Sequence, residues 1–179
     1  MSTSQVFLFV NIVGGVAVLT SYALGLMFYP EQRDYLWGGV TGNLRTIFII
    51  SMGLATVGYL AFFYCSLSYR SIDITDQSLL TSLHIQNILC AIFLIASTFW
   101  MPCTIAYIVT HETIWWAFTI GSLFLSAISL MTLLIIHLTT NISDAYQYKN
   151  LALIGLAAIT AHCTVLDAIT WVVKFPRLH

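Results

Sequence analysis

Asp167 is the residue of this sequence best placed to do chemistry, because it is a carboxylic acid inside a long apolar segment. Helical spacing places Thr160, Thr164, Asp167 and Trp171 on one face of that segment, with Cys163 beside them. A carboxylate at membrane depth is costly unless it is paired or hydrogen-bonded, so such residues usually face the interior of a helix bundle. We therefore predict an inward-facing polar stripe around Asp167.

The expected partner of Asp167 is Arg45, which enters the second apolar segment from the same side. A buried ion pair between Arg45 and Asp167 would hold two helices in register and needs no further role. Alternatively, Asp167 is protonated and bonded to a neighbouring hydroxyl or carbonyl group, because burial disfavours the charged form of an acid. The sequence leaves both arrangements open, and a functional acid is as consistent with it as a structural clamp.

Histidines offer a second chemistry, since two of them on facing helices can ligate the iron of a haem. His84 and His137 are the pair best matched in depth, about 6 Å apart by helix rise. A histidine inside a membrane is more often a hydrogen-bonded packing residue that joins helices. We take that packing role as the expected one for both side chains.

The remaining reactive groups argue against catalysis and against a metal centre. The lysines, Lys149 and Lys174, lie at segment boundaries, and the four cysteines form no C-x-x-C pair. The sequence contains no nucleophile elbow, no metalloprotease helix motif and no phosphate-binding loop. We predict that the protein is not an enzyme and has no metal site, and the sequence identifies no cofactor.

Five long apolar segments must position these residues. Of 179 residues, 59% are hydrophobic and 7% are charged, and the mean hydropathy is +0.91, whereas a soluble domain carries about 25% charged residues. A helix of about 20 apolar residues crosses the hydrocarbon core of a bilayer. We predict an all-α, five-span transmembrane helical bundle that forms one domain over residues 1–179, with spans near 6–29, 44–69, 79–101, 113–137 and 151–173.

The orientation follows from the basic residues, which favour the cytoplasmic side of a membrane. Four lie on the side of the first loop and the C-terminus and two on the other side: Arg33, Arg45, Lys174 and Arg177 against Arg70 and Lys149. We therefore expect the N-terminus outside and the C-terminus inside. The net charge of −1 argues against a nucleic-acid partner, which would need a basic face.

The tryptophans gather at one end of the predicted spans: Trp37, Trp100, Trp115, Trp116 and Trp171. Indole rings favour the headgroup level of a bilayer, so we expect Trp115 and Trp116 to anchor the protein at that interface. Trp171 lies one helical turn from Asp167, and Trp37 lies in the overlying first loop. We predict that Trp37, Trp100, Asp167 and Trp171 line a ligand-binding pocket, with Trp37 as its lid.

In layout the chain resembles the TspO/translocator-protein family, which has a similar length, five helices and many tryptophans. Met52-Gly53-Leu54-Ala55 is similar to the Met-Gly-x-Ala of the second helix of that family, Gln86-Asn87 to its Gln/Asn pair, and Leu166-Asp167 with Trp171 to its Leu-Asn and following Trp. The Trp-x-Pro-Pro of the family's first loop is absent, and an aspartate stands at position 167. The resemblance implies a pocket inside the bundle for a porphyrin, a sterol-like or another lipophilic molecule, closed by the first loop.

Two functions of different classes remain. The protein binds or transports a lipophilic small molecule in a pocket near the tryptophan-rich end, which the polar stripe favours. Alternatively, it is a non-catalytic structural subunit of a larger membrane complex, which the short loops favour. The expected partners are the lipid bilayer, such a lipophilic molecule, and either other membrane proteins or a second copy of the chain.

Overall fold

The computed structural model describes residues 2–70, 77–139 and 148–176, with the side chains at 69, 70, 77 and 78 left out of the description. All regular structure in these residues is helical, and five helical segments are long and apolar enough to cross a membrane. They are α1 (Thr3–Phe28), α2 (Gly42–Arg70), α3 (Gln77–Thr110), α4 (Thr113–Thr139) and a continuous run of α5 (Lys149–Ala161), η3 (His162–Trp171) and α6 (Val172–Lys174). The predicted all-helical architecture is confirmed.

The helix boundaries agree with the predicted spans except at the end of the third. α3 continues through Pro102 to Thr110, although that span was expected to stop near residue 101. The apolar residues after Pro102 therefore extend the helix, which then turns sharply into α4 at Thr113. His111 in this turn has a φ of 59°, a left-handed conformation that allows the chain to reverse within two residues.

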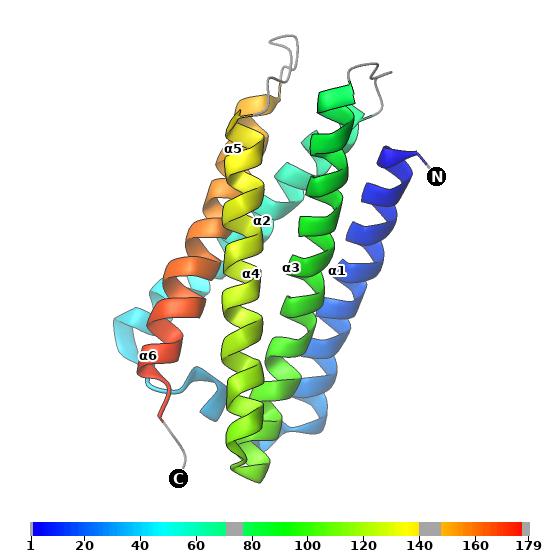
Figure 1. The fold of residues 1–179 in the computed structure, drawn as a ribbon. Helices are drawn as coiled ribbons and strands as arrows, with labels where there is room; N and C mark the ends of the chain where they lie inside the picture. Colours follow the sequence, from blue (N-terminus) through cyan, green and yellow to red (C-terminus); the bar gives the residue numbers. More distant parts are fainter. Residues whose placement is uncertain (1, 71–76, 140–147, 177–179) are drawn as a thin grey trace.

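The helices pack in an order that differs from their order in the sequence (Figure 1). α1 packs mainly on α3, α3 packs on α4, and α2 packs mainly on the α5 run. α1 and α2 are neighbours in the sequence, but they make few contacts with each other. The two ends of the chain lie at opposite ends of the bundle, as an odd number of antiparallel helices requires (Figure 1).

α2 and α5 touch through their backbones at Gly58 and Gly155. A Cβ atom added to Gly58 would lie 2.6 Å from the carbonyl oxygen of Gly155, so only glycine allows this approach. In α1, Gly25 similarly admits Met101 and Ile105 of α3. Small residues at such contacts are typical of helix packing in membranes, where close approach supplies van der Waals energy.

Two hydrophobic cores fill the bundle, one toward each end. The core near the N-terminus, which we call the upper core, lies around Phe7, Phe62 and Leu133. The lower core includes or contacts all five tryptophans, with Trp116 and Trp171 buried within it. The tryptophans thus gather at one end, as predicted, and they form part of a single packed cluster.

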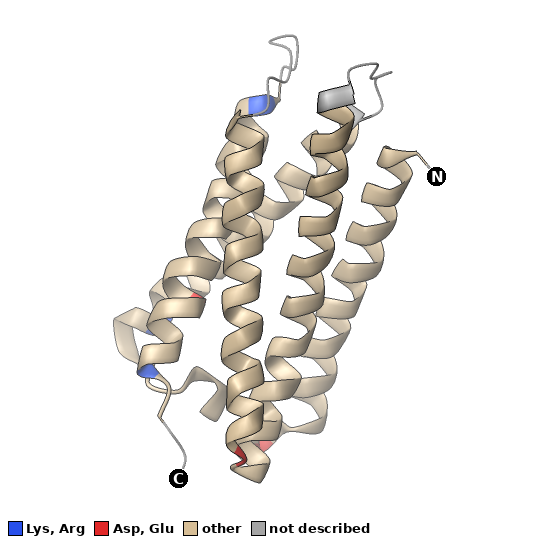
Figure 2. Ribbon diagram, viewed as in Figure 1, with Lys and Arg blue, Asp and Glu red and all other residues tan. Residues whose placement is uncertain are grey.

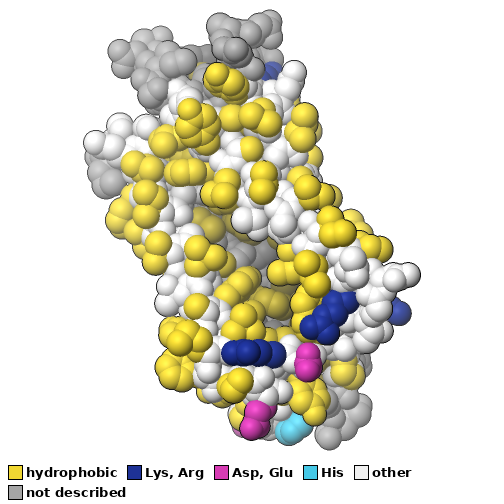
Figure 3. All heavy atoms as spheres, turned by 180° about the vertical axis from the view of Figure 1, so that it is seen from behind, with side chains coloured by type: hydrophobic (Ala, Val, Ile, Leu, Met, Phe, Trp, Pro, Cys, Tyr) yellow, Lys and Arg dark blue, Asp and Glu magenta, His cyan; other side chains and the backbone are white. Residues whose placement is uncertain are grey.

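The outer surface is apolar along the helices and charged at their ends. Exposed leucine, isoleucine, valine and phenylalanine side chains cover the spans, and Figure 3 shows this hydrophobic surface on the face seen from behind. Figure 2 shows Lys, Arg, Asp and Glu gathered mainly at the helix ends. Figure 3 also shows that the face is hollowed above the basic side chains of the lower end.

Candidate functional site

The π-helix η3 carries the most chemically active residues of the described chain. It spans His162–Trp171, between the α-helical parts of the last span. Its wider turn is visible in the side chain of Thr170, whose Oγ1 donates a 2.6 Å hydrogen bond to the carbonyl oxygen of Val165, five residues earlier. Residues five apart therefore lie above one another here, whereas an α-helix places residues three and four apart together. π-Helical turns within α-helices are frequent at functional sites.

The wider turn brings His162 and Asp167 together. Nε2 of His162 lies 3.4 Å from Oδ2 of Asp167, and Nδ1 of the same ring lies 2.9 Å from Oγ of Ser51 in α2. A polar chain therefore runs from Ser51 through His162 to Asp167 and joins α2 to the last span. The edge of His162 also packs against Phe48, with ring centroids 6.4 Å apart.

Two further side chains surround the Asp167 carboxyl group. Cys163, one turn earlier, forms a side-chain hydrogen bond with it. Tyr22 of α1 lies close enough to interact electrostatically with both Asp167 and Cys163. The Asp167 side chain is still 31% exposed, so it is not fully enclosed by these partners. Asp167 thus has neighbours from α1, through Tyr22, and from α2, through the His162–Ser51 contact.

The predicted pairing of Asp167 with Arg45 is wrong for this structure. Arg45 contacts Asp34 of the first loop at 3.8 Å, and both side chains are solvent-accessible, at 43% and 91% exposure. The Arg45 guanidinium group also lies 4.4 Å from the centroid of the Trp37 ring, a cation–π contact. Arg45 is therefore held at the membrane boundary by loop residues, while Asp167 takes a partner from its own helix.

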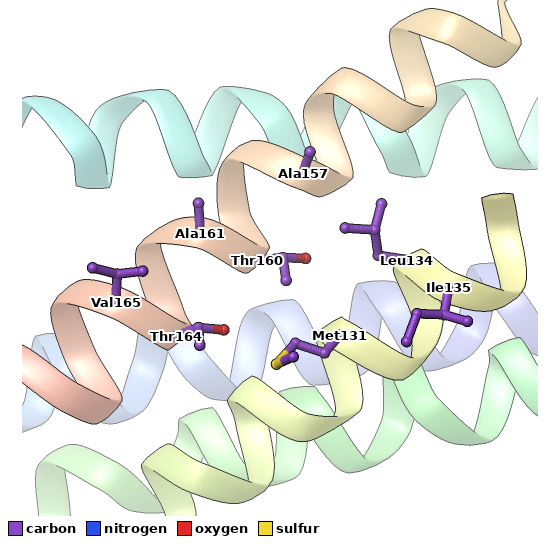
Figure 4. Close-up of a pocket in the computed structure, with 8 residues that line it drawn as sticks. All are labelled: Met131, Leu134, Ile135, Ala157, Thr160, Ala161, Thr164 and Val165. Atoms are coloured by element: carbon purple, nitrogen blue, oxygen red, sulfur yellow. The ribbon is translucent and has the colours of Figure 1, made fainter.

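The predicted polar stripe is divided between two faces. Thr160 of α5 and Thr164 of η3 line a groove of about 320 Å³ between α4 and the last span, together with Met131 and other apolar side chains (Figure 4). Asp167 is directed instead toward His162 and Tyr22. The π-helix is the reason, because it changes the angular position of every residue that follows His162. A second apolar groove, of about 480 Å³, lies between α1 and α3, and neither groove includes Asp167.

Three of the four residues predicted to line a pocket lie in or beside the Asp167 region. The rings of Trp100 and Trp171 are 5.7 Å apart, and Trp100 also packs against Tyr22 at 5.6 Å. The indole nitrogen of Trp100 is buried without a hydrogen-bond partner among the described residues. These contacts make a continuous aromatic wall from α1 through α3 to the last span.

The first loop contacts this wall through Leu36, whereas Trp37 was the residue predicted to act as a lid. Nε1 of Trp171 donates a 2.9 Å hydrogen bond to the carbonyl oxygen of Leu36, and the backbone of Gly39 bonds to that of Lys174 at 3.1 Å. Trp37 itself stacks with Arg45. The loop is thus fixed to the end of the last span by its backbone.

Trp116 departs from its expected role as an interfacial anchor. It is only 9% exposed and stacks on Phe175, with ring centroids 5.1 Å apart and an interplanar angle of 24°. Trp115 is partly buried and contacts Phe118. The two adjacent residues point to different surroundings, because neighbours on a helix are about 100° apart.

The histidine pair considered for haem does not share a site. His84 is exposed on α3, whereas His137 is buried against Phe62 in the upper core. His162, which lies far from the pair in depth, makes the site contacts instead. Among the described residues no group of three or more His, Cys, Asp or Glu side chains could hold a metal ion.

Ser51, His162 and Asp167 are the residue types of a Ser-His-Asp catalytic triad. The surroundings of Ser51, however, are not those of a catalytic serine. Ser51 lies inside α2, where backbone N–H groups are engaged in the helix, so no adjacent pair of donors is available to stabilise an oxyanion. The arrangement instead positions a carboxyl group: His162 and Cys163 hold Asp167 from one side. The site is suited to accepting hydrogen bonds or binding a positive charge.

Sequence reasoning identified Asp167 but missed its partners. His162 is five residues away, a spacing at which an α-helix turns side chains to different sides. No proline or glycine in η3 signals the wider turn. No family model, curated protein or solved structure matches this chain.

Proposed function

We propose that this protein is a multi-pass membrane protein that binds or transports a lipophilic small molecule within its bundle, near the tryptophan-rich end. Five apolar helices with an apolar outer surface support the membrane location. Short connections leave little of the described chain outside the spans. Binding would use the region between α1, α2 and the last span, where contacts between α1 and α2 are few.

One observation carries the proposal: contacts hold the Asp167 side chain in place, and yet this side chain remains partly accessible. Its position is seven residues before Lys174, about 10 Å from that end of the span by helix rise. An acid at this depth normally faces a functional interior or a paired charge, and Arg45 does not provide the charge. A structural clamp would bury its carboxyl group, whereas 31% of the Asp167 side chain is accessible.

The aromatic side chains would supply the apolar contacts for such a ligand. Trp100 and Trp171 form one wall, and Tyr22 extends it to α1. Binding sites for small molecules are typically apolar with a few polar groups that fix orientation. In this arrangement Asp167 is the polar group, and the first loop, bonded to Trp171 through the Leu36 carbonyl group, would close the end of the site.

Ligand-dependent stabilisation tests the proposal. The purified protein in detergent would be heated with a neutral sterol (cholesterol), a porphyrin (protoporphyrin IX) and lipophilic compounds of either charge, and unfolding followed by tryptophan fluorescence. At least one compound should raise the melting temperature of the wild type, and Asp167→Asn should reduce that rise. Asp34→Asn, which changes an exposed loop acid, serves as the matched control. Equal stabilisation of wild type and Asp167→Asn by every active compound would contradict the proposal.

The groove in Figure 4 favours a second candidate, a structural role in a larger assembly. It lies between α4 and α5 and is lined almost entirely by apolar side chains, with Ala157 and Ala161 on one wall and Leu134 and Ile135 on the other. Small residues beside larger ones allow a further transmembrane helix to approach closely. Ala157→Trp should then disrupt a complex detected by native mass spectrometry. An unchanged complex, or a monomer in the wild type, would exclude this use of the groove.

A further inference from the structure

Among the side chains that the structure describes, no arginine or lysine forms an ion pair with the Asp167 carboxyl group. In the described chain these residues lie in the first loop or in the first or last turn of a span: Arg33, Arg45, Arg70, Lys149 and Lys174. Arg45, the partner expected from the sequence, is engaged by Asp34 and Trp37. Asp167 is also the only acid of the described spans that lies away from their ends. A carboxylate at this position would therefore place an uncompensated negative charge at membrane depth.

The hydrogen bonds around His162 do not require the ring to supply the missing charge. In one neutral tautomer, Nε2–H donates to Asp167 and Nδ1 accepts from the hydroxyl group of Ser51. The Cys163 thiol donates a further hydrogen bond to the carboxylate. With His162 in this neutral form, all of these partners are uncharged, so they would orient the acid and leave a carboxylate charge available.

Aromatic rings lie near the acid. Tyr22 is its neighbour from α1, and Trp100 contacts both Tyr22 and Trp171. Trp171 is four residues after Asp167 on the same span. A carboxylate next to tyrosine and tryptophan rings is the combination that recognises ammonium groups, because the ring faces and the acid both attract positive charge.

We infer that the lipophilic ligand is a cation, an organic ammonium whose charged group lies against Asp167 and whose apolar part packs on Tyr22 and Trp100. This inference rests on the proposed function and narrows it to one class of ligand. A carboxylate at position 167 would disfavour anionic ligands, such as a porphyrin with ionised propionates. It also gives a neutral sterol no electrostatic advantage.

Three probes of similar shape test the inference on the full-length protein in nanodiscs: benzyltrimethylammonium, its neutral carbon isostere neopentylbenzene, and the anion phenylmethanesulfonate. Affinities would be measured by quenching of tryptophan fluorescence and by thermal shift. The cation should bind the wild type at least about tenfold more tightly than the neutral isostere, with the anion weakest. In Asp167→Asn this preference should be smaller than in the wild type, and in Asp34→Asn it should remain.

A second variant keeps the test decisive if Asp167→Asn folds poorly. Trp100→Leu should weaken binding of the cation more than binding of the isostere, because leucine keeps apolar area but has no ring face. Equal binding of cation and isostere to the wild type, an undiminished preference in Asp167→Asn, or no binding of the cation would overturn the inference. If cholesterol or protoporphyrin IX still stabilised the wild type through Asp167, the proposed function would stand and only the cationic class would be wrong.

Discussion

His162 and Asp167 lie five residues apart on one helix, and Nε2 of the histidine is 3.4 Å from Oδ2 of the acid. The π-helical turn between them makes this contact possible. The same imidazole ring contacts Ser51 of α2. A substitution at any of the three positions should therefore change the energetic effect of a substitution at the other two.

A double-mutant cycle should measure the contact between His162 and Asp167. His162→Ala is expected to destabilise the fold because Asp167 loses a donor, and Asp167→Ala added to it should restore part of the loss. We expect a coupling energy of about 0.5–2 kcal/mol, the range for polar contacts between neighbouring residues in membrane proteins. SDS-induced unfolding followed by tryptophan fluorescence provides the free energies, and strictly additive effects would contradict the contact.

Arg45 should be energetically independent of Asp167. Because Arg45 is exposed and bonded to Asp34, Arg45→Met is expected to cost less than about 1 kcal/mol of stability. A cycle that combines Arg45→Met with Asp167→Asn should give a coupling within about 0.5 kcal/mol of zero. The cycle of Arg45→Met with Asp34→Asn is the positive control. A large coupling between Arg45 and Asp167 would instead support the ion pair expected from the sequence.

Gly58→Ala should weaken the contact between α2 and α5. The new Cβ atom would lie 2.6 Å from the Gly155 carbonyl oxygen, so the helices must separate, at an expected cost of about 1–3 kcal/mol. Gly53→Ala in the same helix is the matched control, since nothing lies within 4 Å of its Cβ position. It should be neutral or stabilising by up to about 1 kcal/mol, as alanine favours helices over glycine. Equal effects of the two substitutions on SDS unfolding would refute the close approach.

Trp171→Phe should loosen the first loop while keeping most of the aromatic packing. The variant loses the hydrogen bond from Nε1 to the Leu36 carbonyl oxygen, which is worth about 1 kcal/mol. Hydrogen–deuterium exchange should then increase at Gly39, whose backbone bonds to Lys174 in the same contact region. Trp115→Phe, on a residue that packs against Phe118, should leave exchange at Gly39 unchanged, and an identical response would argue against the loop anchor.

The residue sequence was enough to predict the five helices, the short connections and the gathering of the tryptophans at one end. These features depend on segment length and composition, because a helix long and apolar enough to cross a bilayer can be recognised without its neighbours. Asp167 was identified on the same basis, since an acid in an apolar segment is costly wherever the helix packs. The extension of α3 past Pro102 was the exception.

The contacts of Asp167 depend on how the helices turn and pack, and they could not be predicted from the sequence. Depth along a helix can be counted from the sequence, but the direction of a side chain depends on the local helical turn and on which helices are adjacent. The π-helix moved Asp167 away from Thr164 and toward His162, and the packing of α2 on α5 brought Ser51 to the same ring. Arg45, at the depth expected of a partner, was instead held by Asp34 and Trp37. Which residue contacts an acid inside a span therefore depends on helix register and packing. Residue spacing along an ideal α-helix does not predict either of them.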